Sequence, residues 1–257
     1  MAETLSYVYA ISRADADLRP EVAGIAGAEV RLVTSGALAA LVSTVPADEF
    51  DELGLRKNLE DMRWLETTVR EHNRVVDTAA ADSTVAPLAL ATVYYNDARV
   101  QTALAEQEPA FLDVLELMTG RTEWGVKAYA DLSKSAAQPA ESEADTAERP
   151  GKAYLGKIRE RREGQAEAEQ EALEQAGEIH DALSELAQAS RLHPPQNREL
   201  AAYRGLMVLN GAYLVDDERS AEFASAVDNI ARTSPLRTEL TGPWAPYSFA
   251  VVATERT

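Results

Sequence analysis

The stretch L-A-A-Y-R-G-L-M-V-L-N-G-A-Y-L-V, residues 200–215, decides the fold of the second half of the chain. It consists of two apolar runs, 200–209 and 211–215, that meet at the pair Asn210-Gly211. Asn-Gly between apolar runs is the strongest short-range signal for a β-hairpin, because both residues tolerate the positive φ angles of a tight turn. The stretch therefore predicts two adjacent strands.

Regular elements flank this stretch on both sides. Upstream, residues 151–192 predict a long helix, because their apolar positions step alternately by three and four up to Pro194-Pro195. Downstream, an aspartate at position 216 or 217 caps a helix that continues through Ile230. The remaining β-like runs are 122–131, 236–240 and 247–253, the last of them after a Gly-Pro break.

From residue 122 onward the predicted order is β, α, β, β, α, β, which is the ferredoxin-like arrangement. We therefore predict a C-terminal ferredoxin-like domain over residues 120–257, with the long helix as a helical insertion. Residues 133–150 are rich in Ser, Ala, Glu and Pro and show no periodicity. Such a segment buries too little apolar surface to offset its ordering entropy, so we expect a mobile loop there.

Residues 1–119 predict a separate N-terminal α/β domain, so the expected fold class is α+β with two α/β domains. The run Leu5 to Ile11 has the β-branched and aromatic content of a strand. The pair Ser35-Gly36 separates two further β-like runs and predicts an early hairpin. The other predicted elements are a strand or buried loop at 87–95 and long amphipathic helices at 56–81 and 98–118.

Composition narrows the classes of function. The chain has 257 residues, enough for two compact domains, and a net charge of -18 that would repel nucleic acid and anionic lipid. It contains no cysteine, which excludes disulfides and thiol chemistry. It also lacks a signal-peptide pattern and a run of about 20 apolar residues, so we expect a cytoplasmic protein that binds neither nucleic acid nor membrane.

No constellation of residues predicts catalysis. The three histidines, His72, His180 and His193, are dispersed, and we expect surface or capping roles for them rather than a metal site. Residues 120–127 superficially resemble a phosphate-binding loop, but they open a strand, whereas such a loop must open a helix. We therefore predict no enzymatic activity, no metal and no cofactor.

Charge is distributed unevenly along the long helix. Cations crowd its start, including Arg159, Arg161 and Arg162, whereas acidic residues dominate after Glu163. Cations near a helix N-terminus oppose the helix dipole, so local stability does not explain this order. Two explanations remain: a docking surface for a partner that uses the three arginines, or a solvated face whose charges pair along the helix. We expect residues 172–186 to pack on their own domain and residues 152–170 to project or lie loosely against it.

The segment G-P-W-A-P-Y-S-F at 242–249 has a specific spacing of Gly, Pro, Trp, Tyr and Phe. It is similar to the G-P-W-P-P-Y-S-F signature near the end of gas vesicle protein F/L (GvpF/GvpL) family members, and the chain resembles this family. Four further segments match in order: Y-V-Y at 7–9, H-N-R-V-V at 72–76, W-G-V-K at 124–127 and L-N-G-A-Y-L-V at 209–215. The chain departs at 87–93, where P-L-A-L-A-T-V replaces a P-L-R-F-G-T-V type run.

This resemblance implies a minor gas vesicle component that acts in assembly and is not an enzyme. Such a protein is expected to bind the hydrophobic shell protein GvpA and other accessory Gvp proteins, and to limit aggregation before the shell nucleates. It also implies two α/β domains, the second ferredoxin-like with a long helical insertion. The alternative is a small-molecule-binding or enzymatic ferredoxin-like protein, which a deep pocket with convergent polar groups would favour.

The aromatic residues of the C-terminal signature allow two interpretations. Trp244, Tyr247 and Phe249 either close the C-terminal core around a turn stiffened by proline, or form a contact surface for the shell protein. Clustered aromatic side chains bind at low entropy cost, so they join the three arginines as candidate partner-binding residues.

Overall fold

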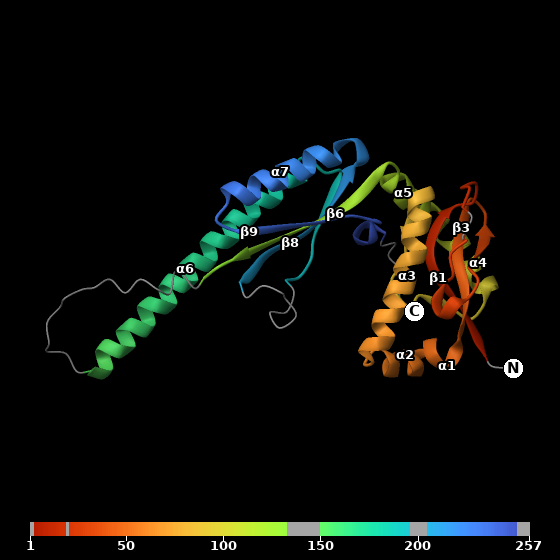
Figure 1. Cartoon of the computed structure of the whole chain (residues 1–257), viewed down its shortest axis with the longest axis horizontal. Coiled ribbons are helices and arrows are strands. Elements are labelled where there is room, and N and C mark those ends of the chain that lie inside the picture. The colour runs from red at the N-terminus through yellow and green to blue at the C-terminus, as the bar shows by residue number, and fades with distance from the viewer. Residues whose placement is uncertain (1–2, 19–20, 133–149, 196–204, 251–257) are drawn as a thin grey trace. The chain divides into compact units, whose positions relative to one another are not determined.

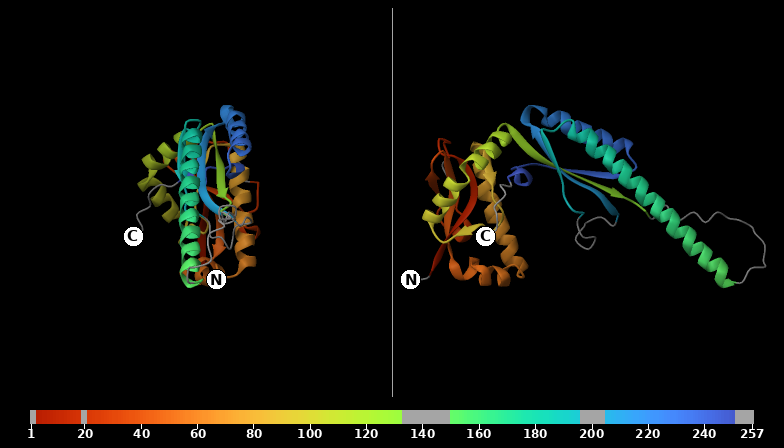
Figure 2. Two further views of the ribbon diagram at one scale, coloured as in Figure 1. Left: turned by 90° about the vertical axis from the view of Figure 1, so that its left-hand side faces the viewer. Right: turned by 180° about the vertical axis from the view of Figure 1, so that it is seen from behind.

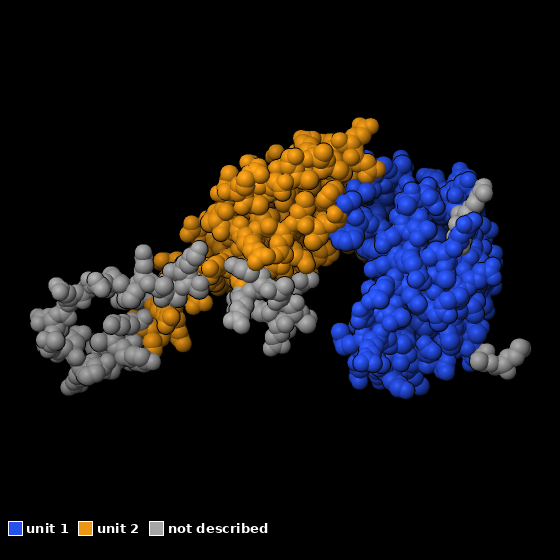
Figure 3. Space-filling model, viewed as in Figure 1, with its two compact units in different colours: residues 1–123, 243–257 blue, residues 124–242 orange. Residues whose placement is uncertain are grey.

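The computed structural model describes residues 3–18, 21–132, 150–195 and 205–250. The chain forms two compact units, residues 1–123 with 243–257 and residues 124–242 (Figure 3). Our prediction placed one boundary near residue 120 and all later residues in the second domain. The structure instead returns the chain to the first unit after Gly242. The loop predicted at 133–150 lies outside the described residues, except for Pro150, which begins a helix.

The first unit is built on a sheet with β1 (Thr4–Arg13) among its inner strands. The other strands are β2 (Arg31–Ser35), β3 (Leu38–Pro46), β4 (Val85–Pro87) and β5 (Val93–Tyr94). Their order is β2-β3-β1-β4, β5 also pairs with β1, and the pairs are antiparallel. The predicted early hairpin is confirmed: Ser35 faces Leu38, and Gly36 in the turn has a φ of +56°.

Helices cover both faces of this sheet (Figure 1). They are α1 (Ala47–Phe50), α2 (Glu52–Asn58), α3 (Met62–Asp82), α4 (Asp97–Glu106) and α5 (Glu108–Met118), with a 3₁₀ turn at Ile25–Gly27. Tyr7 and Tyr9 pack toward α1 and α3, whereas Val8 and Ile11 pack toward α4 and α5. The register between β1 and β3 shifts after Val8, so the alternation of side chains changes there. Because both faces are buried, residues 5–12 of β1 are hydrophobic apart from Ser6 and Ser12, whose hydroxyls donate hydrogen bonds.

Two predicted helices are each divided in the structure. The helix expected over 56–81 is interrupted before Met62, because the Asp61 side chain accepts hydrogen bonds from the backbone N–H groups of Arg63 and Trp64 and caps α3. The helix expected over 98–118 is interrupted at Gln107. The helical spacing of the sequence predicts that this helix buries Leu59, Met62, Leu65, Val69, His72, Val76 and Ala79. The structure confirms His72, Val76 and Ala79, buries Thr68 and Val75 as well, and leaves Met62 72% exposed.

The second unit follows the predicted β, α, β, β, α, β order. Its elements are β6 (Arg121–Ala130), α6 (Pro150–Ser184), β7 (Ala189–Leu192), β8 (Leu206–Asp216), a 3₁₀ turn at Asp217–Arg219, α7 (Ser220–Thr233) and β9 (Arg237–Trp244). The order in the sheet is β7-β8-β6-β9. Helices α6 and α7 lie side by side on one face of it (Figures 1 and 2). Its core joins Val126, Leu183, Tyr213 and Phe223.

The prediction of a tight turn at Asn210-Gly211 is wrong. Strand β8 runs through both residues and pairs antiparallel with β7, with Gly211 opposite Leu192. Pairing between strands therefore overrides the local turn preference, and α6 ends at Ser184 instead of residue 192. Gly211 has a different role: a Cβ atom there would lie 2.8 Å from the Tyr213 hydroxyl, so the ring of Tyr213 requires glycine at this position.

The last predicted strand is also corrected. β9 continues through Gly242-Pro243 as far as Trp244, and Tyr247–Phe249 form a 3₁₀ turn rather than a strand. Pro246 has no N–H for a sheet ladder, and the Ser248 N–H is bonded to the Glu123 carboxylate. These two constraints favour a turn over a strand.

Two glycines test the packing of the helices. A Cβ atom at Gly54 would lie 2.3 Å from the Asp48 carbonyl oxygen, because α1 and α2 meet there, whereas a Cβ at Gly177 in α6 would meet nothing within 4 Å. We expect Gly54→Ala to lower the free energy of unfolding by about 1–3 kcal/mol. Gly177→Ala should raise it by up to about 1 kcal/mol, because alanine favours helix. Urea denaturation followed by circular dichroism measures both, and a Gly54→Ala variant as stable as the wild type would contradict the packing.

Candidate functional site

An aromatic cluster lies at the centre of the first unit, and three of the sequence segments that carry the family resemblance contribute to it. Its members are Tyr7, Tyr9, Phe50, Trp64, His72 and Tyr247. The ring centroids of Tyr7 and Tyr9 are 4.9 Å apart, and those of Tyr7 and His72 are 5.7 Å apart. Tyr247 reaches the cluster from the C-terminal segment, with its ring centroid 6.1 Å from that of His72.

His72 is buried, at 1% exposure, which corrects our expectation of a surface or capping histidine. The Tyr7 hydroxyl oxygen accepts the Ala91 N–H at 2.9 Å and lies 2.9 Å from Nδ1 of His72. The Tyr7 O–H can therefore donate to Nδ1 in the tautomer that carries the imidazole proton on Nε2. Burial lowers the pKa of His72 to about 4, and the Leu88 backbone offsets this only in part.

The C-terminal segment is attached to the first unit by polar contacts as well as by its rings. Glu123, 9% exposed, accepts hydrogen bonds from the Ser248 N–H at 2.8 Å and from the Ser248 hydroxyl at 2.6 Å. The Tyr247 hydroxyl donates to Oδ1 of Asn73 at 3.2 Å. Burial also raises the pKa of Tyr247, with smaller contributions from Asp77 and Tyr7. A carboxylate that bonds both polar hydrogens of one serine fixes the position of the segment.

The candidate residues of the C-terminal signature divide into two groups. Tyr247 and Phe249 are partly buried against the two cores of the first unit. We had expected them to close the core of the C-terminal domain, and the structure corrects this. Trp244 is 54% exposed. Closure of a core therefore accounts for Tyr247 and Phe249, whereas more than half of the Trp244 surface is exposed to solvent.

The other three candidate residues lie on α6 in the second unit. Arg159, Arg161 and Arg162 are exposed, and Nε of Arg159 donates to the Glu163 carboxylate at 2.8 Å one turn along the helix. This ion pair raises the pKa of Arg159. Of the side chains described between residues 156 and 171, none is buried. Ala172, Ala176, Ile179 and Leu183 are buried, so the later part of α6 packs on its unit as predicted.

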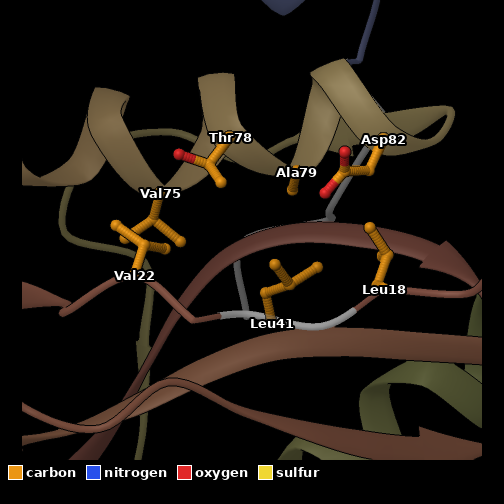
Figure 4. A pocket seen from close by; sticks show the side chains of 7 residues that line it. All are labelled: Leu18, Val22, Leu41, Val75, Thr78, Ala79 and Asp82. Carbon is orange, nitrogen blue, oxygen red and sulfur yellow. The ribbon is translucent and has the colours of Figure 1, made fainter.

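A small hollow lies between α3 and the sheet of the first unit (Figure 4). Its lining is mostly apolar, and Thr78 and Asp82 supply its polar side chains. Its volume is about 10 Å³, room for at most one water molecule. Within the part of the chain that the structure describes, no three His, Asp or Glu side chains are grouped so that they could hold a metal ion.

Several known proteins resemble this chain over nearly its whole length. Residues 5–251 match the family model for gas vesicle synthesis protein GvpL/GvpF. The chain is 40% identical to gas vesicle protein L of Streptomyces sp. (strain CB03234), covering 98% of this chain and 95% of that protein. It is 30% identical to gas vesicle protein F of the same strain, covering 95% and 98%. Crystallised GvpF from Anabaena sp. PCC7120 has a similar fold, with a TM-score of 0.67, 21% identity and 99% of both chains covered.

The fold and the aromatic cluster that receives the C-terminal signature thus define an α+β protein with the architecture of crystallised gas vesicle proteins. The chain belongs to the GvpL/GvpF family of gas vesicle synthesis proteins. This confirms the resemblance drawn from the sequence segments. The family is a gas vesicle family and is not known as an enzyme family. No helix in the described part of the chain is long and apolar enough to cross a bilayer.

The burial of His72 predicts a pH dependence of stability. Its pKa is about 4 in the folded state against 6.5 in the unfolded chain, so above pH 6.5 both states are neutral and the histidine carries no penalty. As the pH falls from 6.5 to 4, the unfolded chain takes up a proton that the fold excludes, and about 3 kcal/mol of stability is lost. His72→Phe should reduce this dependence in urea titrations at several pH values. His193→Gln, in the second unit, should leave it unchanged, and an unchanged dependence in His72→Phe would contradict the assignment.

Proposed function

We propose that the protein is an accessory or minor structural protein of gas vesicle assembly. It binds the hydrophobic shell protein GvpA and other Gvp proteins, and it limits aggregation of the shell protein during vesicle nucleation. The observation that carries this proposal is membership of the GvpL/GvpF family over nearly the whole chain. A cytoplasmic location, with association to the gas vesicle, follows from the same role.

Two features of the first unit favour binding over catalysis. The hollow between α3 and the sheet holds at most one water molecule, too little for a small-molecule substrate, and the Tyr7 hydroxyl is already bonded to the Ala91 N–H and to Nδ1 of His72. The strand order β7-β8-β6-β9 further supports a ferredoxin-like second unit, in which α6 is the first helix and its unburied first half is the long helical insertion. We propose this classification on the same basis.

Within this function, α6 is the proposed docking surface for another accessory Gvp protein. An ideal helix of 35 residues is about 50 Å long, and the described side chains of its first half are not buried against the chain itself. The three arginines lie in that half, ahead of a predominantly acidic part. A helix with separated blocks of charge offers complementarity to a partner with the opposite pattern.

The proposed function is tested by following light scattering of purified shell protein on dilution from denaturant, with and without this chain. We expect co-purification of the two proteins and suppressed scattering when this chain is present. Bovine serum albumin at the same concentration is the control for non-specific protection. If the two proteins neither co-purify nor change each other's aggregation, the proposed function is wrong.

Reversal of the three arginines tests the docking surface on α6. The variant Arg159→Glu, Arg161→Glu, Arg162→Glu should weaken binding of an accessory partner at low salt and leave thermal unfolding unchanged, because the three side chains are exposed. A matched control reverses the exposed cations Arg63, Arg70 and Arg99 of the first unit, which changes net charge by the same amount. Equal weakening by both triple variants would indicate an effect of net charge alone and would refute a docking surface on α6.

A further inference from the structure

Trp244 differs from the rest of the C-terminal signature in its exposure. Ala245 is 9% exposed, and Tyr247 and Phe249 are partly buried against the cores of the first unit. Trp244, between Pro243 and Ala245, is 54% exposed. Tryptophan has the largest apolar side chain, so its exposure places a large apolar surface in contact with water. This contact is unfavourable and does not contribute to the stability of the fold.

The backbone that presents Trp244 is held in place on its C-terminal side. Pro246 fixes one backbone angle, and the Tyr247 N–H bonds to the Ala245 carbonyl at 2.8 Å. Both polar hydrogens of Ser248 then bond to Glu123. A side chain on a pre-ordered backbone loses little further entropy on binding.

The surroundings of Trp244 indicate the chemistry of a partner. Residues 240–250 contain no charged side chain, so along the chain this segment offers neither an ion pair nor a charge that would repel an apolar surface. A second copy of this chain is disfavoured as the occupant, because each copy carries a net charge of -18. The complementary surface is therefore apolar, uncharged and on another protein.

We propose that Trp244 is the anchor residue of an interface with an apolar surface of a partner protein. This inference rests on the proposed function, under which the partner is the hydrophobic shell protein. Trp244 is then the part of the signature that binds, whereas Tyr247, Ser248 and Phe249 hold it in position. Exposed tryptophans on ordered backbone are typical centres of binding energy in protein interfaces.

Trp244→Ala tests the proposal, with Tyr95→Ala as the matched control. Tyr95 is also an exposed aromatic residue of the first unit, at 77%, but it lies outside the signature and directly before Asn96 and Asp97. We expect Trp244→Ala to weaken binding to purified shell protein by at least about tenfold and Tyr95→Ala by less than about twofold. Circular dichroism and thermal unfolding should match the wild type for both variants.

Fluorescence gives a second readout that does not depend on affinity. The difference between the emission spectra of the wild type and Trp244→Phe isolates Trp244 from Trp64 and Trp124, and this difference should shift to shorter wavelength when shell protein is added. If the wild type binds and Trp244→Ala binds equally well, the proposal is overturned while the proposed function stands. If the wild type does not bind the shell protein, both are overturned. Self-association that is lost in Trp244→Ala while shell binding is unchanged would also overturn it.

Discussion

Burial of β1 on both faces is the constraint on which the first unit depends. A strand covered on both sides must be apolar at nearly every position, and each face requires its own layer of helices. Helices α1 and α3 supply one layer, α4 and α5 the other. The two tyrosines on the α3 side need polar partners for their hydroxyls, which they find in His72, Ser43 and the backbone. One buried strand therefore determines both the layering and the polar groups at the centre of the core.

Local sequence patterns predicted an element correctly where that element is formed by interactions between residues close in sequence. The strand at residues 5–11, the early hairpin and the strand at 122–131 were found from alternation and turn residues. The same kind of pattern gave a wrong prediction at Asn210-Gly211. Residues 189–192, which the sequence pattern assigns to the end of the long helix, form β7, and its pairing with β8 keeps Gly211 in an extended strand. Prediction of the last strand failed because Glu123 and Ser248, which bond to each other, are 125 residues apart, with the whole of the second unit between them in sequence.

The candidate functional residues also depend on contacts between residues distant in sequence, which local patterns do not reveal. Aromatic content and spacing were enough to single out Trp244, Tyr247 and Phe249, but nothing local distinguishes a tryptophan that stays exposed from a tyrosine that inserts beside a buried histidine. His72 shares the helical spacing of Val76 and Ala79, and that spacing was the available signal for its burial, although we had expected a surface or capping role. Its role became visible only with Tyr7 beside it, since the hydroxyl that accommodates the imidazole comes from 65 residues earlier in the chain.

The return of the chain to the first unit after Gly242 affects the order in which the protein is completed during synthesis. Ala245, Tyr247 and Phe249 belong to the cores of the first unit, yet they are translated after the whole of residues 124–242. Synthesis of the second unit is therefore complete before that of the first, although the second unit begins later in the chain. The cores of the first unit lack their last side chains until residues 245–249 have been translated. Nascent chains that end before residue 245 hold an incomplete first unit beside a complete second one, the reverse of the usual vectorial order of domain folding.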